Sequence, residues 1–174
     1  MENLIERIQT MLSVTPVRWH SLSQTLPADL LIRRPASSEW STVECLQHLI
    51  DTERVFQFRV KCFLDSIDLP AFDPDSQGTK SGGHSPTDMA GEFETRRLQS
   101  LRSIETLVEA DLDRRVRHQD LGPVILREML SEWAAHDLNH TIQAERALIQ
   151  PFLLECGPWI VYFKDHLVTG IDYR

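Results

Sequence analysis

The sequence predicts an all-α protein in which four long helices form a bundle, as one domain over residues 1–174. Apolar residues recur at spacings of three and four along four long stretches, which is the period of an α-helix. Helix-capping residues or prolines stand near the boundaries of these stretches, and no stretch reads convincingly as a β-strand. A chain of 174 residues is long enough to bury one sizeable core.

The first helix is expected over residues 2 to about 25, where apolar residues repeat from Leu4 onward. Thr15 and Pro16 resemble an N-cap followed by proline at the first helical position, so a break or a kink is expected there. Residues 30–38 then indicate a loop that carries one short apolar anchor.

The second helix is expected to begin at Ser41 or Thr42, because Ser41 followed three residues later by Glu44 has the spacing of a capping box. It should end between residues 65 and 69, since Pro70 cannot continue a helix.

A long irregular segment is expected over residues 70–85, which contain prolines and glycines without any periodicity. Segments of this length in compact domains are commonly functional, so this one is a candidate cover for the mouth of a site. Ser85 and Pro86 then cap a third helix that frays near Asp111 and whose expected apolar side includes Leu98.

The fourth long helix is expected over residues 124–149, after a polar stretch at 114–123 that closes with a Gly-Pro turn signal. Pro151 is expected to end this helix. Residues 159–168 indicate a last short helix packed on the outside of the bundle.

Composition and charge narrow the functional classes. The net charge of -8 argues against a nucleic-acid partner, which needs a surface rich in Lys and Arg. No apolar run is long enough to span a bilayer and no signal-peptide pattern is present, so we expect a cytoplasmic protein without a membrane partner. Three scattered cysteines do not make a disulfide framework, and Cys45 and Cys62 fit buried free thiols.

Two histidines four residues apart are the sharpest functional signal. His136 and His140 share one face of the fourth helix, because residues i and i+4 lie one turn apart. They fall on the stripe that should face the bundle interior, where two unpaired imidazoles are costly to bury. His48 flanks the inward face of the second helix, so the sequence predicts a metal site formed by these three histidines.

Three imidazoles leave at least one coordination position open, which is the arrangement of catalytic zinc sites. An ion held this way lowers the pKa of a bound water and can polarise an oxygen or a thiol. The stretch from His136 to His140 differs from the His-Glu-x-x-His of zinc proteases, because Asp137 is too short for the role of that glutamate. We expect Asp137 to bond a neighbouring helix instead.

Other ionisable residues are weaker candidates. Three carboxylates one turn from a ligand could orient an imidazole or act as a general base, although a surface role is the simpler interpretation of each: Glu44, Asp51 and Glu132. Four further histidines lie in loops or terminal segments: His20, His84, His118 and His166. His84 is the best of these, because its loop is the candidate cover.

The residues around the three histidines resemble the DinB/YfiT-like family. Residues 39–49 carry the resemblance with Trp-Ser before His48, and residues 133–143 carry it with the His-x-x-x-His pair. The similarity covers nearly the whole chain to about residue 150. It implies an up-down-down-up four-helix bundle, often dimeric, in which His48, His136 and His140 bind a divalent metal ion. Nickel and zinc are the first choices for that ion, with iron and manganese as alternatives.

The resemblance implies two kinds of activity on a small-molecule substrate. One is metal-dependent hydrolysis, and the other is transfer that uses a low-molecular-weight thiol such as bacillithiol or mycothiol. Two further interpretations stay open on the residues themselves: a non-catalytic metal-binding, stress-response or interaction module, and a structural bundle whose histidines only pack or hydrogen-bond.

Overall fold

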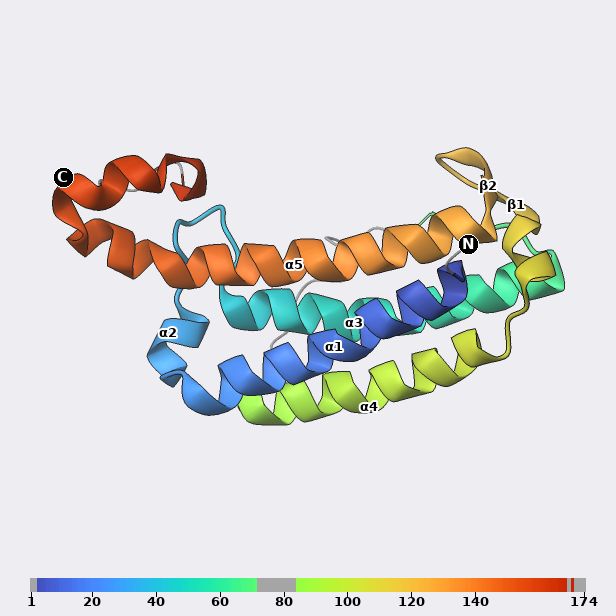
Figure 1. Ribbon diagram of the computed structural model, residues 1–174, viewed down its shortest axis with the longest axis horizontal. Helices are drawn as coiled ribbons and strands as arrows, with labels where there is room; N and C mark the ends of the chain where they lie inside the picture. The colour runs from blue at the N-terminus through green and yellow to red at the C-terminus, as the bar shows by residue number, and fades with distance from the viewer. Residues whose placement is uncertain (1–2, 72–83, 169, 171–174) are drawn as a thin grey trace.

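Four long helices make up most of the structure, a computed structural model that describes residues 3–71, 84–168 and 170 (Figure 1). The long helices are α1 (Leu4–Thr25), α3 (Thr42–Asp65), α4 (Pro86–Glu105) and α5 (Leu126–Glu155). A short helix, α2 (Ala28–Ile32), precedes α3, and a hairpin of β1 (Arg115–His118) and β2 (Gly122–Ile125) precedes α5. The predicted all-α four-helix bundle is therefore confirmed.

The helices run in an up-down-down-up order. In Figure 1, α1 and α5 point one way along the bundle, whereas α3 and α4 point the other way. Each of α1 and α3 packs against both α4 and α5. Most of the cover expected over residues 70–85 lies outside the described residues.

The interior consists of two apolar clusters with a polar layer between them. One cluster surrounds Phe56, Phe63 and Trp133, and the other surrounds Trp19, Leu46 and Phe93. Along each long helix, buried polar residues fall between the residues of the two clusters: Thr15, Thr52, Glu53, Arg97, Ser100 and Asp137. The three predicted ligands extend this polar layer, since His136 and His140 lie between the two clusters on α5 and His48 lies one turn before Thr52 on α3.

Of the break or kink expected at Thr15 and Pro16, the break does not occur, because α1 is continuous through both residues. Proline lacks the N–H that would bond the carbonyl of Leu12, four residues earlier. That carbonyl instead accepts hydrogen bonds from Arg97 Nη1 at 2.8 Å and Thr15 Oγ1 at 3.2 Å. Tertiary contacts thus replace the hydrogen bond that the proline removes.

The apolar side expected for the third helix was wrong at one position. Leu98 is half-exposed, with 50% of its surface accessible, whereas the neighbouring Arg97 is fully buried. The helix also ends at Glu105, and a 3₁₀ turn over Glu109–Asp113 follows where fraying was expected. A charged residue occupies an interior position here because buried carboxylates compensate it, which a hydrophobic pattern cannot reveal.

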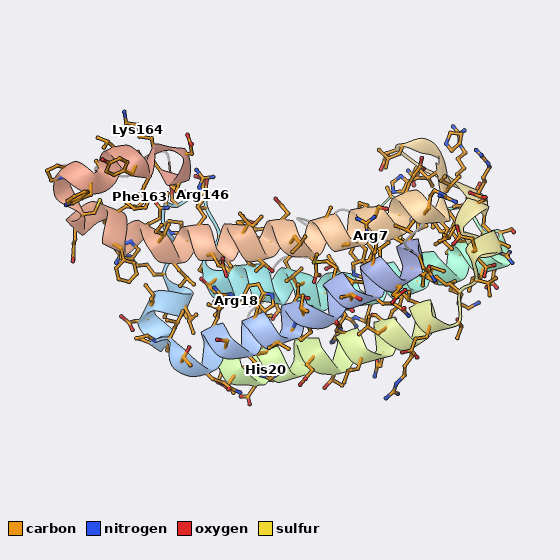
Figure 2. The ribbon with its side chains drawn as sticks, in the orientation of Figure 1. Arg7, Arg18, His20, Arg146, Phe163 and Lys164 are labelled. Carbon is orange, nitrogen blue, oxygen red and sulfur yellow. The ribbon has the colours of Figure 1, made fainter. Side chains whose placement is uncertain are left out.

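The fourth long helix does not end at Pro151, contrary to expectation, and continues to Glu155. Leu153, beyond the proline, is buried, so packing favours the extra turn. Two 3₁₀ helices follow, Gly157–Tyr162 and Lys164–His166, in place of the expected short helix. Figure 2 shows Arg146 on the side of α5 that faces this segment, and its guanidinium donates to the carbonyls of His166 and Leu167.

The sequence predicts only a polar turn where the structure has the hairpin. Its strands pair antiparallel, with Val116 opposite Val124, and Leu69 exchanges backbone hydrogen bonds with Arg117 and Gln119. The strands have only four residues each, with two arginines in β1 and Gly-Pro in β2, and give too weak an alternation to predict. In the described parts of the chain, no helix has the length and apolar character needed to cross a membrane.

Candidate metal centre

The structure brings together the three histidines singled out in the sequence. His48 comes from α3, and His136 and His140 come from successive turns of α5. One ring nitrogen from each lies within 4.8 Å of the other two. The Nε2 atoms of His48 and His136 are 3.0 Å apart, and the ring centroid of His140 lies 4.4 and 4.5 Å from theirs.

Local structure sets this arrangement. The predicted capping box is present: Ser41 Oγ accepts from the Glu44 N–H, and the Glu44 carboxylate accepts from the Ser41 N–H at 2.8 Å. It fixes the first turn of α3, and His48 follows two turns later. Trp40, just before the cap, covers the cluster because its ring stacks on His140, with centroids 5.7 Å apart and planes 19° apart.

Burial keeps all three imidazoles in the neutral form. It lowers the pKa of His48 to about 4 and that of His136 to about 3, and the neighbouring imidazoles add to both shifts. Burial also lowers the pKa of His140, against the opposing effect of the hydrogen bond that its ring donates to Gln143. Neutral imidazoles near pH 7 retain the lone pairs that a metal ion requires.

Gln143 orients the imidazole of His140, a role that the sequence did not predict for it. The Nδ1–H of His140 donates to Gln143 Oε1 at 2.9 Å, which leaves the lone pair on Nε2. Gln143 lies three residues after His140 on the inward stripe, and that spacing was the available signal. His136 Nδ1 has no hydrogen-bond partner among the described residues. Packing against Phe56, with centroids 5.4 Å apart, holds that ring instead.

The candidate orienting carboxylates, all among the described residues, make no hydrogen bond to the three imidazoles. Glu44 caps α3 and pairs with Arg34, and Asp51 accepts a hydrogen bond from Gln47. Glu132 instead lies 3.9 Å from a guanidinium nitrogen of Arg59.

The four weaker histidines also lie outside the cluster, within the part of the chain that the structure describes. His20 contacts Glu94, and the ring of His118 accepts backbone N–H groups inside the hairpin.

A cavity of about 270 Å³ opens beside the cluster. Besides the three histidines it is lined by Trp40, Thr52, Val55, Phe56, Arg59 and Glu132. The Glu132 side chain is half exposed at the cavity, so only partial burial raises the pKa of its carboxyl, and the Arg59 guanidinium offsets part of this. A ligand position left open by three imidazoles would therefore face a space that can admit a small molecule.

A buried ionic cluster supports the same layer. As expected, Asp137 bonds neighbouring helices. Its carboxylate accepts hydrogen bonds from both terminal nitrogens of Arg97, at 2.7 and 2.8 Å, and from the Thr15 hydroxyl. Arg97 also donates to Glu53 at 2.6 Å, and Ser100 donates to the other Glu53 oxygen. Arg97, Glu53 and Asp137 are each almost completely buried. The sequence did not predict this cluster. It joins α1, α3, α4 and α5 at Asp137, the residue that follows His136.

The donor set suits a divalent transition metal. Imidazole nitrogen binds zinc, nickel, copper and iron, and two nitrogens on one tetrahedral zinc lie about 3.3 Å apart when each bond is about 2.0–2.1 Å. The separation of 3.0 Å between two Nε2 atoms is close to that value. The described residues thus fit an ion held between α3 and α5.

Comparison with known proteins identifies the family. YfiT from Bacillus subtilis, described as a probable metal-dependent hydrolase with an unusual four-helix bundle topology, has a similar fold. It is 16% identical, with a TM-score of 0.74 over 87% of this chain and 89% of that chain. No curated protein sequence matches the chain. The sequence profile of the DinB superfamily matches residues 11–144, which is most of the chain, and the protein therefore belongs to the DinB superfamily.

Proposed function

We propose that His48, His136 and His140 bind one divalent metal ion, zinc or nickel, and that the protein is a metal-dependent hydrolase of a small molecule. The convergence of three ring nitrogens within 4.8 Å is the observation that carries the proposal. The description of YfiT as a probable metal-dependent hydrolase supports the choice of hydrolysis over the thiol-dependent transfer that was the alternative.

The residues around the cluster have separate roles in this proposal. A divalent ion bound there supplies Lewis-acid activation of a water or of a substrate carbonyl. Trp40 and Phe56 exclude bulk water from one side of the histidines. The Glu132 carboxyl faces the same cavity with a raised pKa, which suits a group that takes a proton from water and returns it to a leaving group.

Metal analysis of protein purified without a histidine tag tests the site. After reconstitution with zinc or nickel we expect about one ion per chain, and less than about a tenth of that in His136→Ala. His20→Ala is the matched control, because His20 pairs with Glu94 away from the cluster and should leave the metal content unchanged. A wild-type chain that stays well below one ion per chain would contradict the proposal.

Turnover then tests the reaction class. The metal-loaded protein is assayed with a panel of esters and amides, alone and with a low-molecular-weight thiol. Hydrolysis without thiol that is lost in His136→Ala supports the hydrolase. Turnover that requires the thiol would identify the transferase instead, and a loaded protein without any turnover would identify a non-catalytic metal-binding module.

A further inference from the structure

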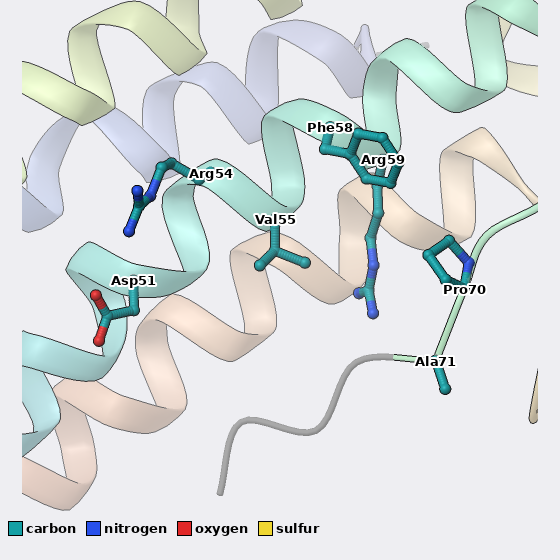
Figure 3. Close-up of a pocket in the computed structure, with 7 residues that line it drawn as sticks. All are labelled: Asp51, Arg54, Val55, Phe58, Arg59, Pro70 and Ala71. Atoms are coloured by element: carbon teal, nitrogen blue, oxygen red, sulfur yellow. The ribbon is translucent and has the colours of Figure 1, made fainter. Parts of the chain in front are cut away.

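Arg59 stands where three cavities meet. It lines the cavity beside the histidines, an outer pocket of about 410 Å³ with Asp51 and Arg54, and an apolar pocket of about 270 Å³. Figure 3 shows Arg59 extending from α3 on the side of Pro70, whereas Arg54 extends on the opposite side of Val55. A cation in this position is accessible from the metal cavity and from the apolar pocket at once.

The side chain of Arg59 is largely buried, yet its guanidinium is weakly bonded. Only 16% of its side chain is accessible, and it lies over the Phe56 ring at 5.8 Å from the centroid. It makes no hydrogen bond to the residues that the structure describes, because Glu132 at 3.9 Å is beyond hydrogen-bond distance. A guanidinium has five N–H donors in a planar fork that matches a carboxylate. Among the described residues, no hydrogen bond occupies those donors, and the one ion pair, with Glu132, is long.

The adjoining pocket supplies an apolar surface next to this cation. Besides Arg59 and Glu132, which it shares with the metal cavity, four apolar residues and two polar ones line it: Leu69, Leu121, Val124 and Met129, with His118 and Glu128. A molecule anchored at Arg59 can therefore place an apolar group on one side and a reactive group beside the histidines on the other. Glu132 nearby disfavours a doubly charged phosphate more than a singly charged carboxylate.

We propose that Arg59 binds the carboxylate of the substrate while the apolar pocket holds a neighbouring apolar substituent, as in an N-acyl derivative of an apolar α-amino acid. This inference rests on the proposed hydrolase function and names its substrate class. Hydrolysis of such a substrate breaks the acyl C–N bond. Water gives its oxygen and one proton to the resulting carboxylic acid, and the amino nitrogen takes the other proton.

Binding of three matched probes tests this inference: N-acetyl-L-leucine, N-acetyl-L-leucinamide and N-acetylglycine, titrated calorimetrically into the zinc-loaded full chain. The leucinamide lacks the carboxylate and should bind about tenfold or more weakly than N-acetyl-L-leucine. N-acetylglycine lacks the apolar side chain and should also bind about tenfold more weakly. Equal affinities for the first two probes, or no binding of N-acetyl-L-leucine at millimolar concentration, would overturn the inference.

Two variants assign these differences to the structure. In Arg59→Gln the distinction between acid and amide should disappear, whereas Arg54→Gln, which changes the exposed arginine of the outer pocket, should retain it. Leu121→Gln should reduce the preference for leucine over glycine, and Leu98→Gln on the exposed face of α4 should not. An unchanged acid preference in Arg59→Gln would overturn the anchor.

The outcome separates this inference from the proposed function. If the chain holds no metal but N-acetyl-L-leucine binding depends on Arg59, the hydrolase proposal fails and the carboxylate site stands. If the chain binds metal through the histidines but Arg59→Gln changes no affinity, the carboxylate site fails and the metal site stands. Metal content is therefore measured on every variant used in the titrations.

Discussion

At the scale of single residues, hydrogen bonding and burial together prepare the three imidazoles. Gln143 accepts the Nδ1–H of His140, which leaves Nε2 as the lone-pair nitrogen of that ring. The rings of His48 and His136 are neutral because burial lowers the pKa of both. Neither effect requires an ion to be present, so the site is preorganised by the protein itself.

Replacing Gln143 tests that preorganisation. Gln143→Leu keeps a similar shape but removes the acceptor for His140 Nδ1–H, so metal affinity should fall by about ten- to a hundredfold. Competition with a chelator of known zinc affinity measures this change. Gln143→Glu keeps an acceptor oxygen and should retain tight binding. Equal affinity in Gln143→Leu and the wild type would show that packing alone orients the ring.

Stability of the metal-free protein should fall as pH decreases from about 6.5 towards 4. The pKa of His48 is about 4 in the folded protein and about 6.5 in the unfolded chain, so the unfolded chain binds the proton first. The contribution is present above pH 6.5 and is at most roughly 3 kcal/mol. Urea unfolding at several pH values measures it, and His48→Gln should give a flatter profile. Parallel profiles for the two proteins would contradict the assignment.

At the scale of elements, one arginine holds the four long helices in register. Arg97 on α4 donates hydrogen bonds to Asp137 on α5 and to Glu53 on α3. It also donates to the backbone carbonyl of Leu12 on α1. Because Asp137 directly follows His136, this network also fixes the turn of α5 that presents a predicted ligand. A charge buried in this way is stable only while all its partners are present.

Arg97→Met should therefore lower the free energy of unfolding by about 3–5 kcal/mol, because it leaves two carboxylates buried without their cation. Arg18→Met is the matched control. Arg18 also joins two helices, by pairing with Glu145, but both side chains are well exposed, so the expected loss is below about 1 kcal/mol. Denaturant unfolding of both variants makes the comparison, and similar losses would contradict a structural role for the buried cluster.

At the scale of the whole molecule, apolar clusters occupy both halves of the bundle and the polar layer lies between them. The layer contains the histidines and the Arg97 cluster, so the packing on either side limits how far α3 and α5 can separate there. The segment after α5 supplies none of the three predicted ligands, although Val168 lines a pocket together with Trp40 and Gln143. Arg146 ties it to the end of α5 through two backbone carbonyls.

Removal of residues 157–174 should leave the metal content unchanged, because all three ligands lie on α3 and on the first half of α5. The deletion exposes the surface that Val168 covers, so the melting temperature should decrease by a few degrees. Metal analysis and thermal unfolding of the truncated chain test both expectations. Loss of the metal would show that the segment supports the site.

The sequence by itself determined the helices, the α3 capping box and the three histidines that converge. Each depends on local spacing: the period of 3.6 residues places His136 and His140 on one face, and a short hydrogen-bonded motif starts α3. What only the tertiary structure decided depends on contacts between distant residues. Arg97 is buried and Leu98 exposed, α1 continues through Pro16, and Arg59 faces three cavities, because in each case the partner groups belong to other elements. Charge compensation and replacement hydrogen bonds of that kind leave no periodic trace in a single chain.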